Sequence, residues 1–331
     1  MRFGLALPHY DFSVPGGGPV TFEHVADTAR DAERLGFDSV WISDHFFLSL
    51  SRYGGDETPH GSLEPMTTLA GLAAVTDRVR LGTLVVCAPF RHPGVLVKQA
   101  TAIDLLSEGR MELGIGAGWY EDEFEAFGLP YGEVGERFAL LEETLQVVEV
   151  LFREGPAEFQ GERFALRGAY NHPGPAQTPR PPIWVGAKGG DRSLRLAARY
   201  ADGWNTVWRW EPNAYGDRVR DAREACERID RDPSTLRLSV GLSTLIGEDD
   251  GDVRARYADL VRRTPAKVPS LEELARDALV GTPDEIRERI AAFEELGVEE
   301  LIASFSSLPF VIHDPSTVEL FAESVLAPAP A

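Results

Sequence analysis

The chain has 331 residues, of which 43% are hydrophobic and 26% are charged, the balance of a soluble globular protein with a sizeable core. Its formal net charge of −20 argues against nucleic acid or an anionic membrane as a partner, because both bind basic surfaces. The charge also counts mildly against a strongly anionic ligand, unless local basic side chains or backbone amides receive it. Cys87 and Cys226 are too few for a disulfide framework or a cysteine zinc site, which favours a reducing compartment.

The ends of the chain and its hydropathy predict a cytoplasmic protein. The first residues, MRFGLALPHYDF, contain one basic residue and a short apolar run, unlike a signal peptide. No apolar stretch approaches the roughly 18 residues that a membrane helix needs. We expect one domain over residues 1–331.

Short apolar runs alternate with amphipathic helical patterns in the first part of the chain. The run from Val79 to Val86 is continuous and rich in β-branched residues, as expected of a parallel strand buried on both faces. Residues 120–128, YEDEFEAFG, are not expected to form a close-packed helix. The predicted elements are strands at 2–7, 39–42, 79–86 and 111–115, and helices at 21–35, 64–75 and 93–106.

The same alternation continues in the second part, with larger insertions. A hairpin is expected at 158–166, turning at Gln160-Gly161, and an acidic helical insertion is expected at 247–279. Residues 327–331 are expected to fray. The predicted strands are 183–185, 203–205, 236–245 and 300–304, and the predicted helices are 135–152, 192–200, 214–229, 283–296 and 316–326.

Eight predicted strands separated mostly by helices favour a (β/α)₈ TIM barrel, with insertions after strand 4, helix 4 and strand 7. The alternative is an open, doubly wound sheet. Such a sheet normally has a glycine-rich phosphate loop after its first strand, whereas this chain has Leu7-Pro8-His9-Tyr10 there.

In a TIM barrel the active site lies at the C-terminal ends of the strands. This rule gives a set of candidate residues from the loops that follow the first six strands. They are His9 and Tyr10, Ser43 to His45, residues 84–90, residues 116–119, residues 186–190 and residues 205–210.

The loop after the fifth strand, GAKGGDRS, is the clearest physical signal for a ligand. Glycines allow backbone N–H groups to converge on an anion, and the start of the next helix adds its positive dipole end. Asp191 or Ser193 can cap that helix. We interpret residues 189–193 as a clasp for a cofactor phosphate; the alternative is a plain turn that needs glycine for its backbone.

The fourth strand ends in GIGAGW, residues 114–119. The absence of side chains would let a planar ring lie against the backbone, with Trp119 as an apolar wall. The alternative is tight packing at the end of a barrel strand. The match to a dinucleotide-binding fingerprint is weak, because no helix is expected to follow.

Asp44 and His45 occupy the position where barrel enzymes keep catalytic side chains. An imidazole exchanges protons near neutral pH, so His45 can be a general acid or base; alternatively the pair only shapes its loop. A metal site built from His9, Asp11, Asp44, His45 and His60 is a further alternative, but no His-x-His pair follows the first strand and no metal is expected. Three tryptophans, Trp204, Trp208 and Trp210, either line an apolar substrate pocket or cover the rim.

Five stretches, in order and spanning almost the whole chain, resemble the luciferase-like oxidoreductases, a family of flavin- and deazaflavin-dependent barrel enzymes. The first three are FDSVWISDHF (37–46), RVRLGTLVVCAPFRHP (78–93) and DLLSEGRMELGIGAGW (104–119). The others are PPIWVGAKGGDRSLRLAARYADGWN (181–205) and GTPDEIRERIAAFEELGVEEL (281–301). Ser43-Asp44-His45 is similar to the branch that uses coenzyme F420, a deazaflavin.

The resemblance implies roles for particular residues. Asp44 would lie by the deazaflavin ring, His45 would assist proton transfer, and the Leu84–Val85 peptide bond would be cis. The glucose-6-phosphate dehydrogenases of this branch have a tryptophan where this chain has Ser49 and an acidic residue where it has Trp119, which argues against sugar-phosphate oxidation. The implied cofactor-binding residues are Asp44, Leu84, Val85, Val86, Ala117, Gly118, Trp119, Gly186, Gly189, Gly190, Asp191, Arg192 and Ser193.

The implied reaction is hydride transfer between F420 and a small, apolar organic substrate. Alternatives are an FMN-dependent monooxygenase supplied by a partner reductase, and a flavin-binding barrel without activity. The resemblance also implies a homodimer, with a flavin or F420 reductase as a further possible partner.

Overall fold

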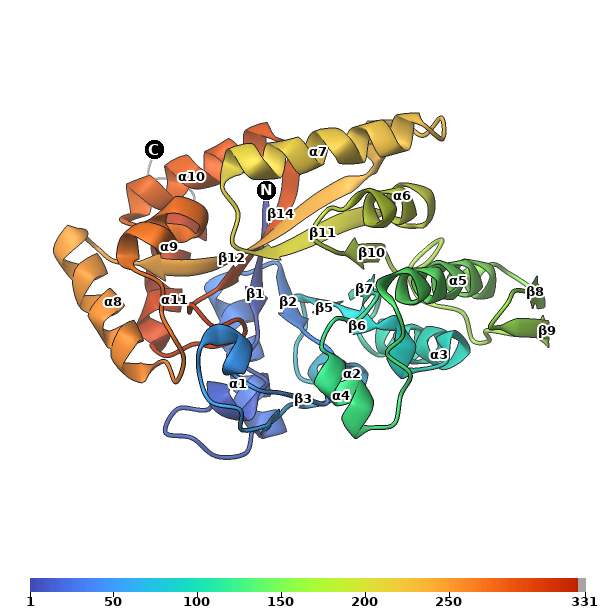
Figure 1. Ribbon diagram of the computed structural model, residues 1–331, viewed down its shortest axis with the longest axis horizontal. Helices are drawn as coiled ribbons and strands as arrows, with labels where there is room; N and C mark the ends of the chain where they lie inside the picture. The colour runs from blue at the N-terminus through green and yellow to red at the C-terminus, as the bar shows by residue number, and fades with distance from the viewer. Residues whose placement is uncertain (327–331) are drawn as a thin grey trace.

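A closed barrel of parallel strands forms the centre of the computed structural model, which describes residues 1–326 (Figure 1). Each strand is hydrogen-bonded to the next in chain order, and pairing of the last with the first closes the ring. Closure confirms the (β/α)₈ TIM barrel and excludes the open sheet. The strands are β1 (Arg2–Ala6), β2 (Ser39–Ile42), β5 (Arg80–Thr83), β7 (Met111–Gly116), β10 (Ile183–Gly186), β11 (Gly203–Trp208), β12 (Arg237–Ile246) and β14 (Val298–Ser304).

Helices pack around the barrel, each with its apolar face inward. The first of them shows why its sequence forms a helix: Thr21 caps its start by accepting from the His24 N–H, and Gly36 ends it with φ of 92°. None of the described helices is long and apolar enough to cross a membrane. The surrounding helices are α1 (Phe22–Leu35), α2 (Pro65–Ala73), α3 (Pro93–Leu106), α5 (Val134–Phe152), α6 (Asp191–Tyr200), α7 (Pro212–Glu227), α10 (Pro283–Glu295) and α11 (Pro315–Phe321).

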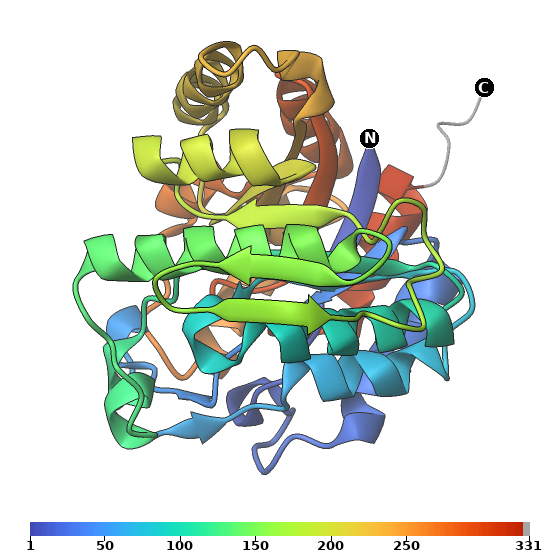
Figure 2. The ribbon, with the colours of Figure 1, turned by 90° about the vertical axis from the view of Figure 1, so that its right-hand side faces the viewer.

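The three predicted insertions are present. The first contains α4 (Glu121–Ala126); the second is the hairpin of β8 (Ala157–Gln160) and β9 (Ala165–Ala169), which lies on the outside of the barrel beside α5 (Figure 2). The third contains α8 (Asp250–Arg263), α9 (Leu271–Asp277) and β13 (Leu279–Gly281), which pairs with β12. A small pair of strands that the sequence did not predict, β3 (Phe47–Leu48) and β4 (His60–Gly61), follows β2.

Two sequence predictions need correction. Residues 121–126 form a helix after all, because Phe124 packs fully into the core. The predicted strand 79–86 is interrupted: β5 ends at Thr83, and β6 (Val86–Cys87) resumes pairing with β7 after a break. The predicted frayed tail, 327–331, lies outside the described residues. Short turns of helix complete the chain, namely η1 (Asp11–Ser13), η2 (Ser51–Tyr53), η3 (Ala88–Phe90), η4 (Pro233–Thr235) and the π-turn η5 (Ala322–Leu326).

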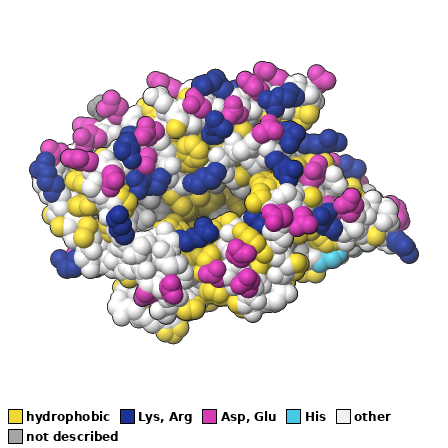
Figure 3. Space-filling view, viewed as in Figure 1, with side chains coloured by type: hydrophobic (Ala, Val, Ile, Leu, Met, Phe, Trp, Pro, Cys, Tyr) yellow, Lys and Arg dark blue, Asp and Glu magenta, His cyan; other side chains and the backbone are white. Residues whose placement is uncertain are grey.

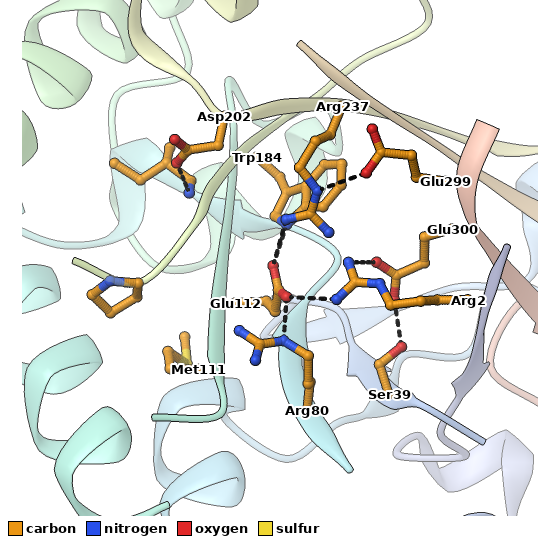
Figure 4. Close-up of polar contacts among 12 residues, drawn as sticks. Arg2, Ser39, Arg80, Met111, Glu112, Trp184, Asp202, Arg237, Glu299 and Glu300 are labelled. Carbon is orange, nitrogen blue, oxygen red and sulfur yellow. Dashed lines mark hydrogen bonds and ion pairs between the residues drawn. The ribbon is translucent and has the colours of Figure 1, made fainter. Parts of the chain in front are cut away.

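Charged side chains fill the N-terminal end of the barrel (Figure 4). Glu112 is buried and pairs with Arg80 and with Arg2, whose Nη1 is 3.4 Å from Oε1. Its other oxygen accepts from the Trp184 indole N–H at 2.6 Å. Arg2 also reaches buried Glu300 at 2.7 Å. This network closes the N-terminal end of the barrel. In TIM barrels that end usually contributes to stability, whereas the catalytic residues lie at the other end.

Candidate active site

A cavity of about 1010 Å³ opens at the C-terminal ends of the strands. Residues at or after the ends of β2, β5, β7, β10, β11, β12 and β14 line it, so nearly the whole barrel contributes. Figure 3 shows the hollow near the middle of the face, with an apolar interior and Lys and Arg side chains at its edge. The position matches the one expected for a barrel enzyme.

Asp44 lies in this cavity with its carboxylate fixed on both oxygens. Arg91 donates to it twice, from Nη1 to Oδ2 at 2.6 Å and from Nη2 to Oδ1 at 3.0 Å. The Cys87 N–H donates to Oδ2 at 2.8 Å. A bidentate arginine holds a carboxylate in one orientation. Sequence reasoning missed Arg91, although it stands within the stretch 78–93 that carried the family resemblance.

His45 also lines the cavity and forms a pair with Glu123 from α4. Its Nδ1 lies 2.8 Å from Glu123 Oε1, and the Phe46 N–H donates to Oε2 at 2.9 Å. Glu123 is only 1% exposed, so the pair is shielded from water. A carboxylate on Nδ1 fixes the orientation and the tautomer of the imidazole ring. Sequence reasoning missed Glu123, because it is one of four acidic residues in a six-residue helix and only the helix geometry points it inward.

His9 has a structural environment. It is fully buried, and both ring nitrogens are engaged: Nδ1 lies 2.9 Å from the Leu7 carbonyl and Nε2 lies 3.0 Å from Ser43 Oγ. Burial lowers the pKa of His9 to about 4. Within residues 1–326, no three His, Cys, Asp or Glu side chains converge in a way that could hold a metal ion. The alternative metal set therefore gains no support from the structure.

Close packing requires the glycines of β7, which is the second of the two interpretations of GIGAGW; because Gly116 also lines the cavity, a ring lying against this backbone stays a prediction. A Cβ on Gly114 would lie 2.2 Å from the Thr83 carbonyl oxygen, and one on Gly116 would lie 2.7 Å from Val85 Cγ2. Gly186, after β10, likewise faces Val85 Cγ1, at 2.5 Å. The Leu84–Val85 peptide bond is cis, as predicted, and Val207–Trp208 is a second cis bond that was not predicted. The predicted Leu84, Val85 and Val86 all line the cavity, as do Ala117, Gly118, Trp119 and Gly186.

The predicted phosphate loop lies at the start of α6. Gly189 has φ of 82°, which favours glycine, whereas Gly190 is the N-cap with an ordinary φ of −70°. No side chain caps the helix; Ser193 instead donates to the Gly190 carbonyl. A Cβ on Gly190 would meet no described atom within 4 Å. Lys188 lines the cavity, but the five predicted residues that follow it do not: Gly189, Gly190, Asp191, Arg192 and Ser193. The Asp191 side chain is exposed and pairs with Arg228 at 3.4 Å.

Arg137, from the first turn of α5, lines the cavity near this loop and was not predicted. It is 8% exposed, and its guanidinium lies 3.8 Å above the Tyr131 ring. Nη1 donates to the Gly132 carbonyl at 2.7 Å, but buried Nε has no hydrogen-bond partner among the described residues. Arg192 joins α6 to α5 by donating to the Gly135 carbonyl at 3.1 Å. The starts of α5 and α6, together with the unsatisfied N–H of Arg137, therefore suit the binding of an anionic group.

The three predicted tryptophans, Trp204, Trp208 and Trp210, do not line the cavity as a group. Trp204 is fully buried and stacks on Tyr215, so it belongs to the core. Trp210 donates to Thr206 Oγ1 at 3.1 Å and lies outside the cavity lining. Only Trp208 lines the cavity, where it forms an apolar wall with Trp119.

Comparison with known proteins decides the family. A family model described as luciferase-like monooxygenase matches residues 1–300. The chain belongs to this family. A curated relative, the F420-dependent glucose-6-phosphate dehydrogenase of Microbacterium testaceum, is 30% identical over 95% of this chain and 92% of its own length.

Solved structures of this family share the barrel. An F420-dependent secondary alcohol dehydrogenase, solved with an F420–acetone adduct, superposes with a TM-score of 0.78 at 20% identity and covers 98% of both chains. An EDTA monooxygenase from Chelativorans sp. BNC1 superposes with a TM-score of 0.79 at 18% identity, covering 98% of this chain and 92% of its own. At these identities the likeness supports the fold alone.

Proposed function

We propose that this protein is an F420-dependent oxidoreductase that transfers a hydride between the deazaflavin and a small organic substrate. The observation that carries the proposal is the His45–Glu123 pair beside the Arg91-fixed Asp44, in one cavity at the C-terminal end of the barrel. The curated relative named as an F420-dependent dehydrogenase, aligned over nearly the whole chain, supports the same cofactor.

The cavity has residues suited to each part of such a cofactor. The backbone of Leu84, Val85 and Val86 provides an apolar surface for the ring, next to Asp44. Buried Arg137 Nε and the amides at the start of α6 would hold the phosphate. When bound, F420 supplies the ring carbon that accepts or gives up a hydride, which is chemistry that no side chain provides.

The chain's own residues then provide orientation and a proton path. His45 lines the cavity while Glu123 holds its Nδ1, so Nε2 is the nitrogen that would give or take the proton of a substrate alcohol or carbonyl. Arg91 holds the Asp44 carboxylate in one orientation in the cavity. Trp119 and Trp208 add apolar surface to the cavity wall.

An FMN-dependent monooxygenase is the second candidate, and the description of the matching family model, luciferase-like monooxygenase, favours it. Both cofactors carry a tricyclic ring and a phosphate, so the phosphate site does not separate them. The proton-transferring pair favours F420, because hydride transfer to or from an alcohol needs a proton acceptor or donor beside the ring.

A titration distinguishes the candidates. The purified protein is mixed with F420 and, separately, with FMN, and the fluorescence of each ring is followed. We expect F420 to bind at least about tenfold more tightly. Tighter FMN binding, or oxygen consumption with reduced FMN, would contradict the proposal. Binding of either cofactor without turnover of any alcohol or carbonyl compound would favour a flavin-binding barrel without activity.

A further inference from the structure

The cavity has the opposite charge to the molecule. The chain has a formal net charge of −20, yet the cavity is lined by six basic side chains and only three acidic ones, Asp44, Glu123 and Glu273. The basic residues are Arg52, Arg137, Lys188, Arg209, Lys267 and Arg276. A basic cavity in an acidic protein focuses a local positive potential, which attracts anions that the remaining surface repels.

Four of these six side chains already have partners. Arg209 pairs with Asp277, and Arg276 lies 3.3 Å from Glu211. Arg137 and Lys188 donate to backbone carbonyl groups. Arg52 and Lys267 differ, because within residues 1–326 neither side chain makes a hydrogen bond or an ion pair; the Arg52 guanidinium lies over the Trp119 ring, and Lys267 bonds only through its backbone N–H. With Arg137 Nε assigned to the cofactor phosphate, these two cations remain available to a further anionic group.

Arg52 and Lys267 come from two different loops, which meet at the opening of the cavity. Arg52 lies in η2, between β2 and α2, and Lys267 lies between α8 and α9. The Lys267 N–H donates to the Tyr53 carbonyl at 2.9 Å, and a Cβ on Gly54 would lie 2.8 Å from Lys267 Cβ. The two loops are thus locked together, and they hold the two cations on one side of the opening.

This basic corner stands away from the proposed phosphate site. Tyr53 and Ala266 pack on Leu50, Leu308 and Val311, which places the corner beside the loop after β14. The proposed phosphate site follows β10, and in the closed ring β14 is three strands from β10. The corner therefore offers a place for an anionic group that is separate from the site proposed for the cofactor phosphate.

Flat apolar walls separate the corner from His45. The Arg52 guanidinium lies 4.7 Å from the centre of the Trp119 ring, and that ring lies edge-to-face with His45 at 5.5 Å. Trp208, Leu308 and Pro309 line the same cavity. A molecule that extends from His45 to Arg52 therefore lies along aromatic and aliphatic surface and meets a positive charge at its far end.

From this arrangement we infer that the substrate is an apolar, planar carboxylate, whose acid group binds Arg52 and Lys267 while its reacting carbon lies by His45. The inference rests on the proposed function and specifies its substrate class. A sugar phosphate fits less well, because its hydroxyl groups would lie against Trp119, Trp208 and Leu308 without partners.

Calorimetric titration of the F420-loaded protein tests the inference with three probes: cinnamate, its neutral analogue cinnamamide, and glucose 6-phosphate. We expect cinnamate to bind about tenfold more tightly than cinnamamide, the effect of one charge-assisted contact. Arg52→Gln and Lys267→Gln should each remove most of that difference and leave cinnamamide binding unchanged. Arg254→Gln on α8, 71% exposed, removes the same charge away from the cavity lining and should change nothing.

A parallel titration of the same variants with F420 tests whether the anion at the corner belongs to the substrate or to the cofactor. Unchanged F420 affinity supports substrate binding at the corner. A loss of F420 affinity in Arg52→Gln would overturn the inference, because an anionic part of the cofactor would then occupy the corner. Equal binding of cinnamate and cinnamamide, or tighter binding of glucose 6-phosphate, also overturns it while leaving the cofactor assignment intact. Failure of F420 to bind the parent protein would overturn the proposed function and this inference together.

Discussion

At the scale of single residues, neighbours in the sequence have different tasks. The Asp44 carboxylate is held by Arg91 and the Cys87 N–H, whereas the adjacent His45 is held by Glu123. His9, the other histidine predicted near the site, is buried and bonded on both nitrogens. Local environment rather than residue type therefore separates the proposed proton carrier from a structural histidine.

His45→Ala tests the proton carrier. The variant should bind F420 nearly as well as the parent but turn over substrate about 10²–10⁴-fold more slowly, the usual contribution of a general acid–base. F420 titration and steady-state rates measure the two effects, and added imidazole should restore part of the rate. If binding and rate fall together, His45 only orients the cofactor.

Glu123→Gln tests the positioning residue behind His45. Glutamine keeps the shape and can still accept from the Phe46 N–H, but it carries no charge to stabilise a protonated imidazole. We expect kcat to fall by about tenfold with KM and F420 affinity unchanged, a loss of roughly 1.4 kcal/mol of transition-state stabilisation. A parallel rise in KM would indicate a structural role instead.

His9 makes stability depend on pH. Its pKa of about 4 in the folded protein lies below the ordinary histidine value of 6.5, so the unfolded chain takes up a proton first as the pH falls. Between pH 7 and pH 5 the free energy of unfolding should drop by about 2 kcal/mol from this residue alone. Urea titrations at both pH values measure the drop.

His9→Asn is the matched variant, because an amide at this position does not titrate. It should be less stable at pH 7, yet lose about 2 kcal/mol less than the parent between pH 7 and pH 5. Identical pH dependence in the two proteins would mean that His9 is not the buried neutral group responsible.

At the scale of elements, each loop has a definite task set by its neighbours. The β7 glycines make room for Thr83 and Val85, and the loop between β10 and α6 combines one left-handed glycine with one open N-cap. The insertions supply what the barrel strands lack: Glu123 from α4, Arg52 from η2 and Lys267 from the segment before α9.

Gly190→Val tests the start of α6 as the phosphate site. Its φ of −70° and the open space at its Cβ allow valine without strain, so the fold should persist. Side-chain bulk would block an anion from the amides, and F420 affinity should weaken by about 1–3 kcal/mol. Gly174→Val, at a glycine that also has nothing described within 4 Å and no left-handed φ, serves as a matched control away from the cavity lining. Unchanged F420 affinity in Gly190→Val would remove phosphate binding from this loop.

At the scale of the whole molecule, the barrel separates chemistry from stability. The cavity occupies the C-terminal end of the strands, and the network around Glu112 and Glu300 occupies the N-terminal end. Strand closure joins residues distant in sequence, as in the pairing of β1 with β14.

Glu112→Ala tests that network. Removal of this buried carboxylate leaves Arg80, Arg2 and the Trp184 N–H without their common acceptor, so the free energy of unfolding should fall by about 3–5 kcal/mol. Glu299→Ala, at a half-exposed carboxylate paired with Arg237, should cost less than about 1 kcal/mol. Urea unfolding followed by tryptophan fluorescence measures both. Equal losses in the two variants would show that the network adds no special stability, and F420 affinity should be unchanged in each.

The sequence alone determined the fold and selected part of the candidate site. Periodicity located the eight barrel strands, because a parallel strand buried on both faces must be apolar throughout and an outer helix must be apolar on one side. The rule that barrel sites lie at strand ends selected Asp44, His45 and the loop after β10. Only the tertiary structure identified Arg91, Glu123, Arg137 and the Arg52–Lys267 corner, because a charged residue on a helix or insertion looks the same in sequence whether it faces solvent or a cavity. Which of these it faces depends on contacts between segments far apart in the chain, and local spacing does not encode those contacts.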